Sequence, residues 1–252
     1  RCLLQQLTAD LVLNAFLYLR VIIRSTLSVN QNNQPKSMLK TKVKASSITN
    51  LTDARYFAAW GVEWLGFDLN QGSENAIPLA NIKAIKEWVD GVKIVGEFSL
   101  QQSTDILAAQ ELLGLDVVQA NMPLALEELI ELQHQPIIKE IVIETDTTEA
   151  DLQDYLTDFA PYATTFLLDF SKNNINWAAI QESQRLTFDY LENVCREQQI
   201  IIGLDFTAQI VEEVLEKLYP YGINVRGGLE EKVGYKSFDE LDDIFEAIAA
   251  YE

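Results

Sequence analysis

Apolar and polar positions alternate in blocks along most of this chain. Short, nearly continuous apolar runs, such as residues 137–143 and 199–203, are each followed by a longer segment with helical spacing. In one such segment, Ile82, Ile85 and Val89 fall on a single helical face. Continuous apolar runs are typical of parallel strands that are covered on both faces of the sheet. The pattern therefore predicts strands that alternate with amphipathic helices.

Eight such strand–helix units follow one another. The strands are expected over residues 42–46, 63–69, 92–98, 116–119, 137–143, 165–169, 199–203 and 223–226. The helices are expected over residues 51–60, 79–89, 103–113, 123–133, 149–158, 177–197, 208–218 and 238–250. This arrangement predicts an α/β fold, the (β/α)₈ TIM barrel. A doubly wound open sheet is the alternative, but Ala45-Ser46-Ser47 stands where its G-x-G-x-x-G motif is expected.

The first 37 residues do not follow this pattern. Residues 11–23 are apolar, but Asn14 and Arg20 interrupt the run. The run is also shorter than the roughly 20 residues of a membrane helix. A signal peptide needs a small-residue cleavage site after its apolar run, and none follows here. We expect residues 1–37 to be an N-terminal extension outside the fold, and residues 38–252 to form a single TIM-barrel domain.

Composition narrows the range of functions. The formal net charge is −19, so nucleic acid and anionic membranes, which repel an acidic protein, are not expected partners. The two cysteines, Cys2 and Cys195, lack metal-type spacing and suit a reducing, cytoplasmic location. The single histidine, His134, lies in a loop-like run and is expected to face solvent. No metal and no cofactor are expected.

Candidate chemistry lies at the carboxyl ends of the predicted strands, where TIM-barrel active sites are found. The polar residues at these ends are Ser46, Asp68, Glu97, Gln119, Glu144, Asp169, Asp205 and Arg226. Gly203 ends the seventh strand, and Gly227 and Gly228 follow the eighth, the usual place of a phosphate site in such barrels. Their backbone N–H groups and the Arg226 guanidinium would bind a small phosphorylated substrate or another anion. The alternative is that these glycines only form tight turns.

Residues 42–54 carry the closest match to a known family. They read Lys-Val-Lys-Ala-Ser-Ser-Ile-Thr-Asn-Leu-Thr-Asp-Ala, which resembles K-V-K-I-C-G-I-T-N-x-x-D-A at the start of phosphoribosylanthranilate isomerases. Further matches follow in the family's order: Gly66-Phe67, Val95-Gly96, Leu115–Gln119, Pro136–Lys139, Phe166–Asp169, Trp177, Gly228-x-Glu230 and Gly234-x-Lys236. The chain is similar to this family over residues 42–250.

The resemblance implies a TIM barrel that catalyses an Amadori rearrangement in tryptophan biosynthesis, turning a phosphoribosyl aminoaldose into an aminoketose. In that family an aspartate acts as general acid, and a cysteine of the first barrel strand acts as general base. Asp169 stands at the acid position, and Ser46 replaces the cysteine. Because a hydroxyl is a weak base near neutral pH, Glu97 and Asp68 are further candidate bases. Gln119 is a candidate for substrate binding.

Three functions remain open on these residues. The first is such an isomerase with an altered site. The second is a divergent barrel that acts on or binds another phosphorylated small molecule. The third is a catalytically silent homologue with a structural or partner-binding role. Each is compatible with a monomer or a homodimer.

Overall fold

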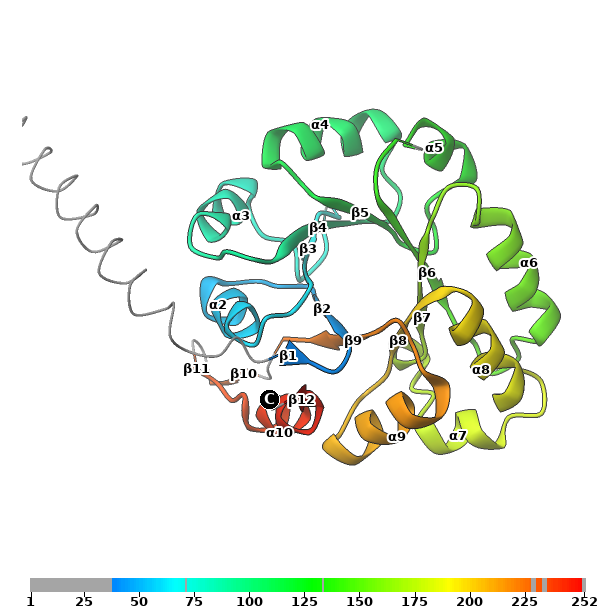
Figure 1. Ribbon diagram of the computed structural model, residues 1–252. Helices are drawn as coiled ribbons and strands as arrows, with labels where there is room; N and C mark the ends of the chain where they lie inside the picture. Colours follow the sequence, from blue (N-terminus) through cyan, green and yellow to red (C-terminus); the bar gives the residue numbers. More distant parts are fainter. Residues whose placement is uncertain (1–37, 71, 133, 228–229, 233–234, 251–252) are drawn as a thin grey trace, which may run out of the picture. The chain divides into compact units, whose positions relative to one another are not determined.

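The computed structural model describes residues 38–70, 72–132, 134–227, 230–232 and 235–250. Residues 1–37 lie outside this range, so the predicted N-terminal extension stays a prediction. Eight parallel strands close into a barrel in chain order, and helices surround the barrel (Figure 1). The (β/α)₈ fold predicted from the sequence is confirmed.

The barrel strands are short and largely apolar. They are β2 (Lys42–Ser46), β3 (Trp64–Asp68), β4 (Lys93–Phe98), β5 (Val117–Ala120), β6 (Ile137–Val142), β7 (Thr165–Asp169), β8 (Gln199–Gly203) and β9 (Gly222–Arg226). Pairing of β9 with β2 closes the ring, with Ser46 opposite Arg226 in the register. This register brings the ends of the first and last barrel strands together at the mouth.

Side chains alternate between the barrel interior and the helix-facing side along each strand. One interior layer is apolar and consists of Trp64, Val95, Val117, Ile138, Leu167 and Ile201. A larger core includes the intervening strand residues, such as Ile200 and Ile202, and the inner faces of the helices. Because the apolar layer fixes the alternation, side chains two residues further along each strand also point into the barrel. These side chains form its mouth.

Each barrel strand is followed by at least one helix. The helices are α2 (Leu51–Ala59), α3 (Leu79–Lys86), α4 (Ser103–Leu113), α5 (Leu126–Glu131), α6 (Glu149–Phe159), α7 (Trp177–Glu182), α8 (Phe188–Glu197), α9 (Ala208–Leu218) and α10 (Asp239–Ile248), with the 3-10 helix η1 (Ser171–Asn173) after β7. Polar side chains cap several of them. Asn50 accepts the N–H of Asp53 at 2.9 Å to begin α2, and Thr148 forms a capping box with Asp151 to begin α6. Such caps fix where each loop at the barrel mouth ends.

The single helix predicted over residues 177–197 is wrong, because this segment forms two helices, α7 and α8. The Ser183 hydroxyl accepts the N–H of Leu186, and the Thr187 hydroxyl accepts the N–H of Tyr190. Side-chain hydrogen bonds of this kind compete with helical backbone bonds and favour helix starts. The break matters below, because it borders a pocket.

The end of the chain also differs from the prediction. The helix expected over residues 238–250 ends at Ile248, and Ala249–Ala250 form the short strand β12. This strand pairs with β1 (Met38–Leu39) in an antiparallel ribbon. A second ribbon, β10 (Glu230–Lys232) with β11 (Tyr235–Lys236), was not expected either.

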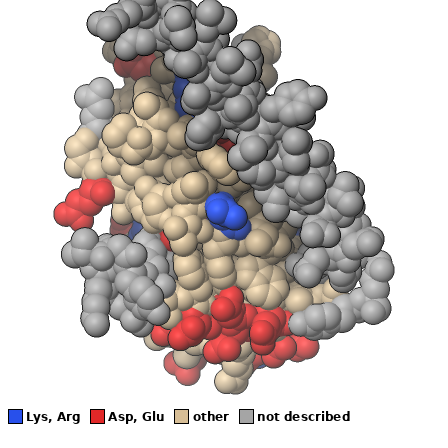
Figure 2. Space-filling view, turned by 90° about the vertical axis from the view of Figure 1, so that its left-hand side faces the viewer, with Lys and Arg blue, Asp and Glu red and all other residues tan. Residues whose placement is uncertain are grey.

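The surface is acidic, in line with the composition. Figure 2 shows acidic side chains gathered at the lower edge of one face, with few basic side chains beside them. The first turn of helix α10 contributes three acidic residues, Asp239, Glu240 and Asp242. His134 is exposed, as predicted. Among the described residues, no helix has the length and hydropathy of a bilayer-spanning segment.

Candidate active site at the barrel mouth

Polar side chains from most strands line the mouth of the barrel. They are Lys44, Ser46, Asp68, Glu97, Gln119, Glu140, Asp169, Asn224 and Arg226, with Gly66 and Gly203 between them. All of these residues are buried except Arg226. The structure therefore brings the predicted candidates Ser46, Glu97, Asp169 and Gln119 to one place. Glu144, a further strand-end residue, is exposed and lies at a separate pocket.

Lys44 and Glu97 form a buried ion pair in the mouth. Lys44 Nζ lies 2.6 Å from Glu97 Oε1, and the two residues are 0% and 4% exposed. Gly66 on the intervening strand makes room for the pair, because a Cβ there would lie 2.1 Å from Glu97 Oε1 and 2.9 Å from Lys44 Nζ. Removing one partner of such a pair leaves the other charge buried without compensation, which costs about 3–5 kcal/mol. The pair therefore fixes the Glu97 carboxylate in position.

Ser46 belongs to the same network. Lys44 Nζ donates to Ser46 Oγ at 2.5 Å, and the Ser46 hydroxyl donates to Asn224 Oδ1 at 2.6 Å. A hydroxyl carries one proton, so that proton is directed at Asn224. The neighbours of Ser46 are thus an ammonium and an amide, and neither of them is a base that would activate the hydroxyl.

The second oxygen of Glu97 takes no part in the ion pair with Lys44. Glu97 Oε2 accepts one long hydrogen bond, 3.4 Å, from the Ser47 hydroxyl. Ser47 adopts a φ of 54°, a left-handed conformation that costs a non-glycine residue about 1–2 kcal/mol. The strained turn after β2 thus places a weak donor at the second oxygen of the carboxylate that Lys44 fixes.

Asp169 is held from the loop after β7 and from β9. Its Oδ1 accepts the Ser171 hydroxyl at 2.7 Å and the Lys172 N–H at 3.1 Å. Its Oδ2 lies 3.5 Å from the Arg226 guanidinium, which also donates to Ser171 Oγ at 3.2 Å. The Asp169 carboxylate is 2% exposed, whereas the Arg226 side chain is 51% exposed. A buried carboxylate thus meets a cation that solvent or a ligand can reach.

Glu140 and Lys172 form a third ion pair at the mouth. Lys172 Nζ lies 2.5 Å from Glu140 Oε1, with side-chain exposures of 38% and 3%. Glu140 belongs to β6, and Lys172 reaches it from η1. Neither residue was among the predicted candidates. The pair places a second exposed cation beside Arg226 on the same segment that holds Asp169.

The remaining predicted residues play different parts. Gln119 donates from Nε2 to Asn121 Oδ1 at 2.7 Å, while its buried Oε1 has no hydrogen-bond partner within the described residues. That oxygen is available to a donor on a ligand. Asp68, by contrast, accepts from the backbone and side chain of Asn70, and from the Ser73 hydroxyl. Its carboxylate is occupied by its own loop.

The predicted phosphate-binding glycines are only partly described. A Cβ on Gly203 would lie 3.3 Å from Asp169 Cγ, so this glycine lets the carboxylate approach β8. Gly227 is partly buried after β9. Gly228 lies outside the described residues. Arg226 is the predicted anion-binding residue whose side chain the structure shows to be accessible.

The one cysteine in the described range does not supply a base. Cys195 lies on α8 in the core, where burial, aided by the nearby Glu192 charge, raises the pKa of its thiol to about 12. The thiol therefore stays protonated near neutral pH. Nor do the described residues bring three His, Cys, Asp or Glu side chains together in the manner of a metal site.

Among the carboxylates of the mouth, Glu97 on β4 and Asp169 on β7 come from strands that are not neighbours. Such a pair can remove a proton from one atom of a bound sugar and donate one to another. Lys44 and Asn224, which hold Glu97 and Ser46, were not among the predicted functional residues. Each lies two residues before the end of its strand, β2 or β9. Side chains two residues apart lie on the same face of a strand, so the sequence could have located both from the strand-end residues Ser46 and Arg226.

Comparison with known proteins identifies the family of the chain. Residues 43–247 match the family model described as N-(5'-phosphoribosyl)anthranilate (PRA) isomerase. The N-(5'-phosphoribosyl)anthranilate isomerase of Maridesulfovibrio salexigens is 24% identical over 206 residues, which cover 82% of this chain and 97% of that protein.

Solved structures give the same result. Phosphoribosyl anthranilate isomerase from Thermus thermophilus has a TM-score of 0.64 at 27% identity, covering 82% of this chain and 98% of that one. A second structure, with a TM-score of 0.64, 20% identity and the same coverage, is phosphoribosyl anthranilate isomerase in complex with reduced 1-(o-carboxyphenylamino)-1-deoxyribulose 5-phosphate. The second likeness concerns the fold alone.

Proposed function

Because the chain belongs to the N-(5'-phosphoribosyl)anthranilate isomerase family, we propose that it catalyses the isomerisation of N-(5'-phosphoribosyl)anthranilate, with Asp169 as general acid and Glu97 as general base. One observation carries the choice of base. Ser46, at the position of the family's cysteine, donates its proton to Asn224, whereas Glu97 is a fixed carboxylate whose second oxygen accepts one long hydrogen bond. Carboxylates are suitable bases for removing a proton next to an electron-poor carbon.

The proposed reaction moves two protons in sequence. Asp169, in its protonated form, gives its proton to the ring oxygen while the bond between that oxygen and C1 breaks, which leaves an iminium at C1. Glu97 Oε2 then takes the proton of C2, and the electron pair of that C–H bond forms the C1–C2 double bond of an enolamine. Protonation of C1 and loss of the C2 hydroxyl proton complete the aminoketose.

The other residues of the mouth bind and orient the substrate. The Lys44 ammonium lies 2.6 Å from Glu97 and holds the Glu97 carboxylate in position beside C2. Arg226, at the end of β9, leaves its ion pair with Asp169 and binds the substrate phosphate instead. Gly203, Gly227 and Gly228 are further candidates for binding this phosphate. Oε1 of Gln119, which has no hydrogen-bond partner among the described residues, accepts a hydrogen bond from a substrate hydroxyl.

A growth test and a rate measurement decide the proposal. We expect the chain to restore growth without tryptophan to a strain that lacks this isomerase. We expect Glu97→Gln, which keeps an acceptor for Lys44, to lower the isomerase rate by about 10²–10⁴-fold, the usual contribution of a general base. Ser46→Ala is expected to lower the rate by less than tenfold, because the hydroxyl only helps to hold Lys44.

A matched control separates loss of a base from loss of charge. Asp154→Asn removes an exposed carboxylate from α6, on the outside of the barrel, and is expected to leave the rate unchanged. Absence of growth and turnover at high expression would overturn the proposal. An inactive Ser46→Ala beside an active Glu97→Gln would instead assign the base to Ser46.

A second candidate function is binding of a phosphorylated small molecule without turnover. The ion pairs favour it, because both proposed catalytic carboxylates already face a cation, Lys44 or Arg226. This alternative predicts phosphate binding that Arg226→Ala abolishes, together with no isomerase activity in any variant. A cytoplasmic location, and a monomeric or homodimeric state, stay predictions for either function.

A further inference from the structure

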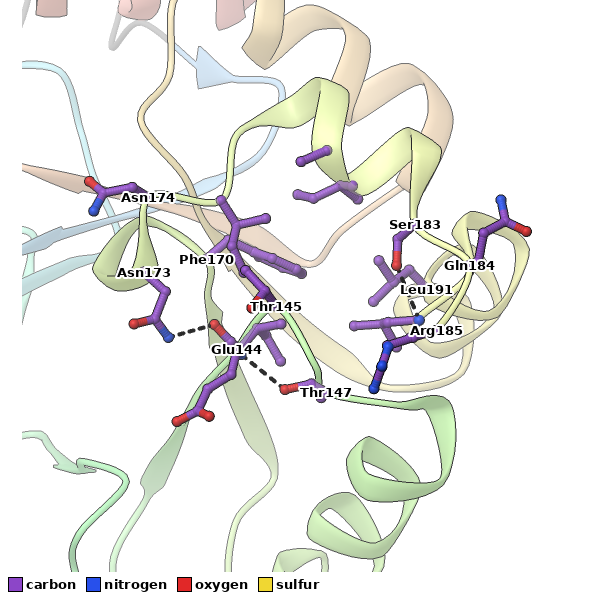
Figure 3. A pocket seen from close by; sticks show the side chains of 15 residues that line it. Glu144, Thr145, Thr147, Phe170, Asn173, Asn174, Ser183, Gln184, Arg185 and Leu191 are labelled. Atoms are coloured by element: carbon purple, nitrogen blue, oxygen red, sulfur yellow. Dashed lines mark hydrogen bonds between the residues drawn. The ribbon is translucent and has the colours of Figure 1, made fainter.

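A separate pocket lies beside the barrel mouth. It has a volume of about 410 Å³ and is formed by the loop between β6 and α6, by η1 and by the turn between α7 and α8 (Figure 3). Pockets that bind small molecules commonly have about 300–1,000 Å³. The α7–α8 break, where a single helix was expected, is what opens this space.

The pocket has an apolar interior and a polar rim. The interior is lined by Ile143, Phe170, Ile175, Ile180, Leu186 and Leu191. The rim carries the hydroxyl and amide side chains of Thr145, Thr147, Asn173, Asn174, Ser183 and Gln184. Figure 3 shows Phe170 on one side of the space, with Leu191 and Arg185 on the other. A flat apolar body with one polar end matches this distribution.

Arg185 supplies the charge at the rim. Its side chain is exposed, and it donates to the Asp146 carbonyl at 3.5 Å, the outer limit of a hydrogen bond. The other charged lining residue, Glu144, directs its carboxylate away from Arg185 in Figure 3. The net charge of the chain is −19, so an exposed guanidinium beside an apolar interior stands out. It favours a ligand with one anionic group, and a carboxylate fits the two parallel N–H donors of a guanidinium.

We propose that this pocket binds a small aromatic carboxylate. The ring lies against the apolar lining that includes Phe170 and Ile175, where contact with the Phe170 ring gains from an offset or edge-to-face arrangement. The carboxylate accepts from the Arg185 guanidinium, and the amides and hydroxyls of the rim take any further polar groups.

The pocket shares a chain segment with the mouth. Phe170, Asn173 and Asn174 line the pocket, while Ser171 and Lys172 between them hold Asp169 and Glu140. An occupant therefore contacts the segment that orients Asp169. Its consequence for catalysis rests on the proposed function, whereas binding itself does not.

Calorimetric titration of the full chain with benzoate and benzamide tests the proposal. The two probes share the ring and differ in charge, so we expect benzoate to bind at least about tenfold more tightly, as one charge-assisted hydrogen bond provides. Arg185→Gln is expected to lower benzoate affinity to that of benzamide. Arg55→Gln, which removes an exposed arginine from α2, is expected to leave benzoate affinity unchanged.

Two further variants locate the binding. Ala179→Phe adds a ring to an exposed lining position on α7 and is expected to abolish binding of both probes even if Arg185→Gln fails to fold. Arg226→Gln removes the more exposed of the two mouth cations, Arg226 and Lys172, and is expected to leave benzoate affinity unchanged. The proposal is overturned if benzoate does not bind at millimolar concentration, if Ala179→Phe binds normally, or if Arg226→Gln loses binding. None of these results depends on isomerase turnover.

Discussion

The two sides of the barrel mouth hold their charges in different ways. On the β2–β4 side, Lys44 and Glu97 both extend from strands, and their side chains are 0% and 6% exposed. On the β7–β9 side, buried Asp169 and Glu140 meet Arg226 and Lys172, whose side chains are 51% and 38% exposed. The first pair is fixed by the sheet, whereas the second set of cations can exchange a protein partner for a ligand. The difference suits one side to holding a carboxylate in place and the other to receiving an anionic substrate.

This comparison predicts unequal costs when a cation is removed from each side. Lys44→Met leaves Glu97 buried without a counter-charge, so we expect the free energy of unfolding to fall by about 3–5 kcal/mol. Lys172→Met also leaves a buried carboxylate, Glu140, without its cation, but the Lys172 side chain is 38% exposed, so water can approach from its side and we expect a clearly smaller loss than in Lys44→Met. Chemical denaturation of both variants near neutral pH measures the two values.

A double variant checks that charge is the cause. Glu97→Leu in the Lys44→Met background removes the stranded carboxylate and is expected to recover most of the lost stability. Equal losses in the two single variants would show that the β2–β4 pair is no more fixed than the other.

The glycines of the two sides sharpen the comparison. Gly66→Ala would place a Cβ 2.1 Å from Glu97 Oε1, so the buried side chains of Glu97 and Lys44 would have to shift together to keep their pair. We expect a loss of about 1–3 kcal/mol, the usual cost of overpacking. Gly203→Ala meets Asp169 at 3.3 Å, a contact that small shifts relieve, so we expect its loss to be clearly smaller. Thermal unfolding of the two variants gives the order, and a costlier Gly203→Ala would contradict it.

The fold could be predicted from the sequence where an element is defined by its own local pattern of apolar and polar residues. The strands 165–169 and 199–203 and the helices 103–113 and 208–218 have the predicted bounds, because apolar runs and helical faces define them locally. The break between α7 and α8 could not be predicted in this way. It depends on Ser183 and Thr187 turning inward to the backbone, and both resemble ordinary surface residues in the sequence.

Site residues could be predicted where each one ends a strand. They could not be predicted where a contact joins side chains from different strands. Glu97, Asp169 and Arg226 could be located because each stands at a strand end. The Lys44–Glu97 pair joins β2 to β4 across Gly66, so it depends on three strands at once. That pairing changes the meaning of Ser46, which the sequence presents as a lone replacement for a base and the structure shows bonded to Lys44 and Asn224.

The Arg226→Gln variant is expected to change stability least. It tests the comparison through ligand binding. Arg226→Gln breaks a 3.5 Å pair whose cation is half exposed, so we expect the free energy of unfolding to change by less than about 1 kcal/mol. The affinity for inorganic phosphate is expected to fall about tenfold, because the guanidinium supplies charge-assisted hydrogen bonds to phosphate oxygens. Arg196→Gln is the matched control, since it removes an exposed pair with Glu192 on α8 and is expected to leave phosphate affinity unchanged. A loss of stability in Arg226→Gln as large as in Lys44→Met, with phosphate affinity intact, would mean that both sides of the mouth are fixed and that the anion is received elsewhere.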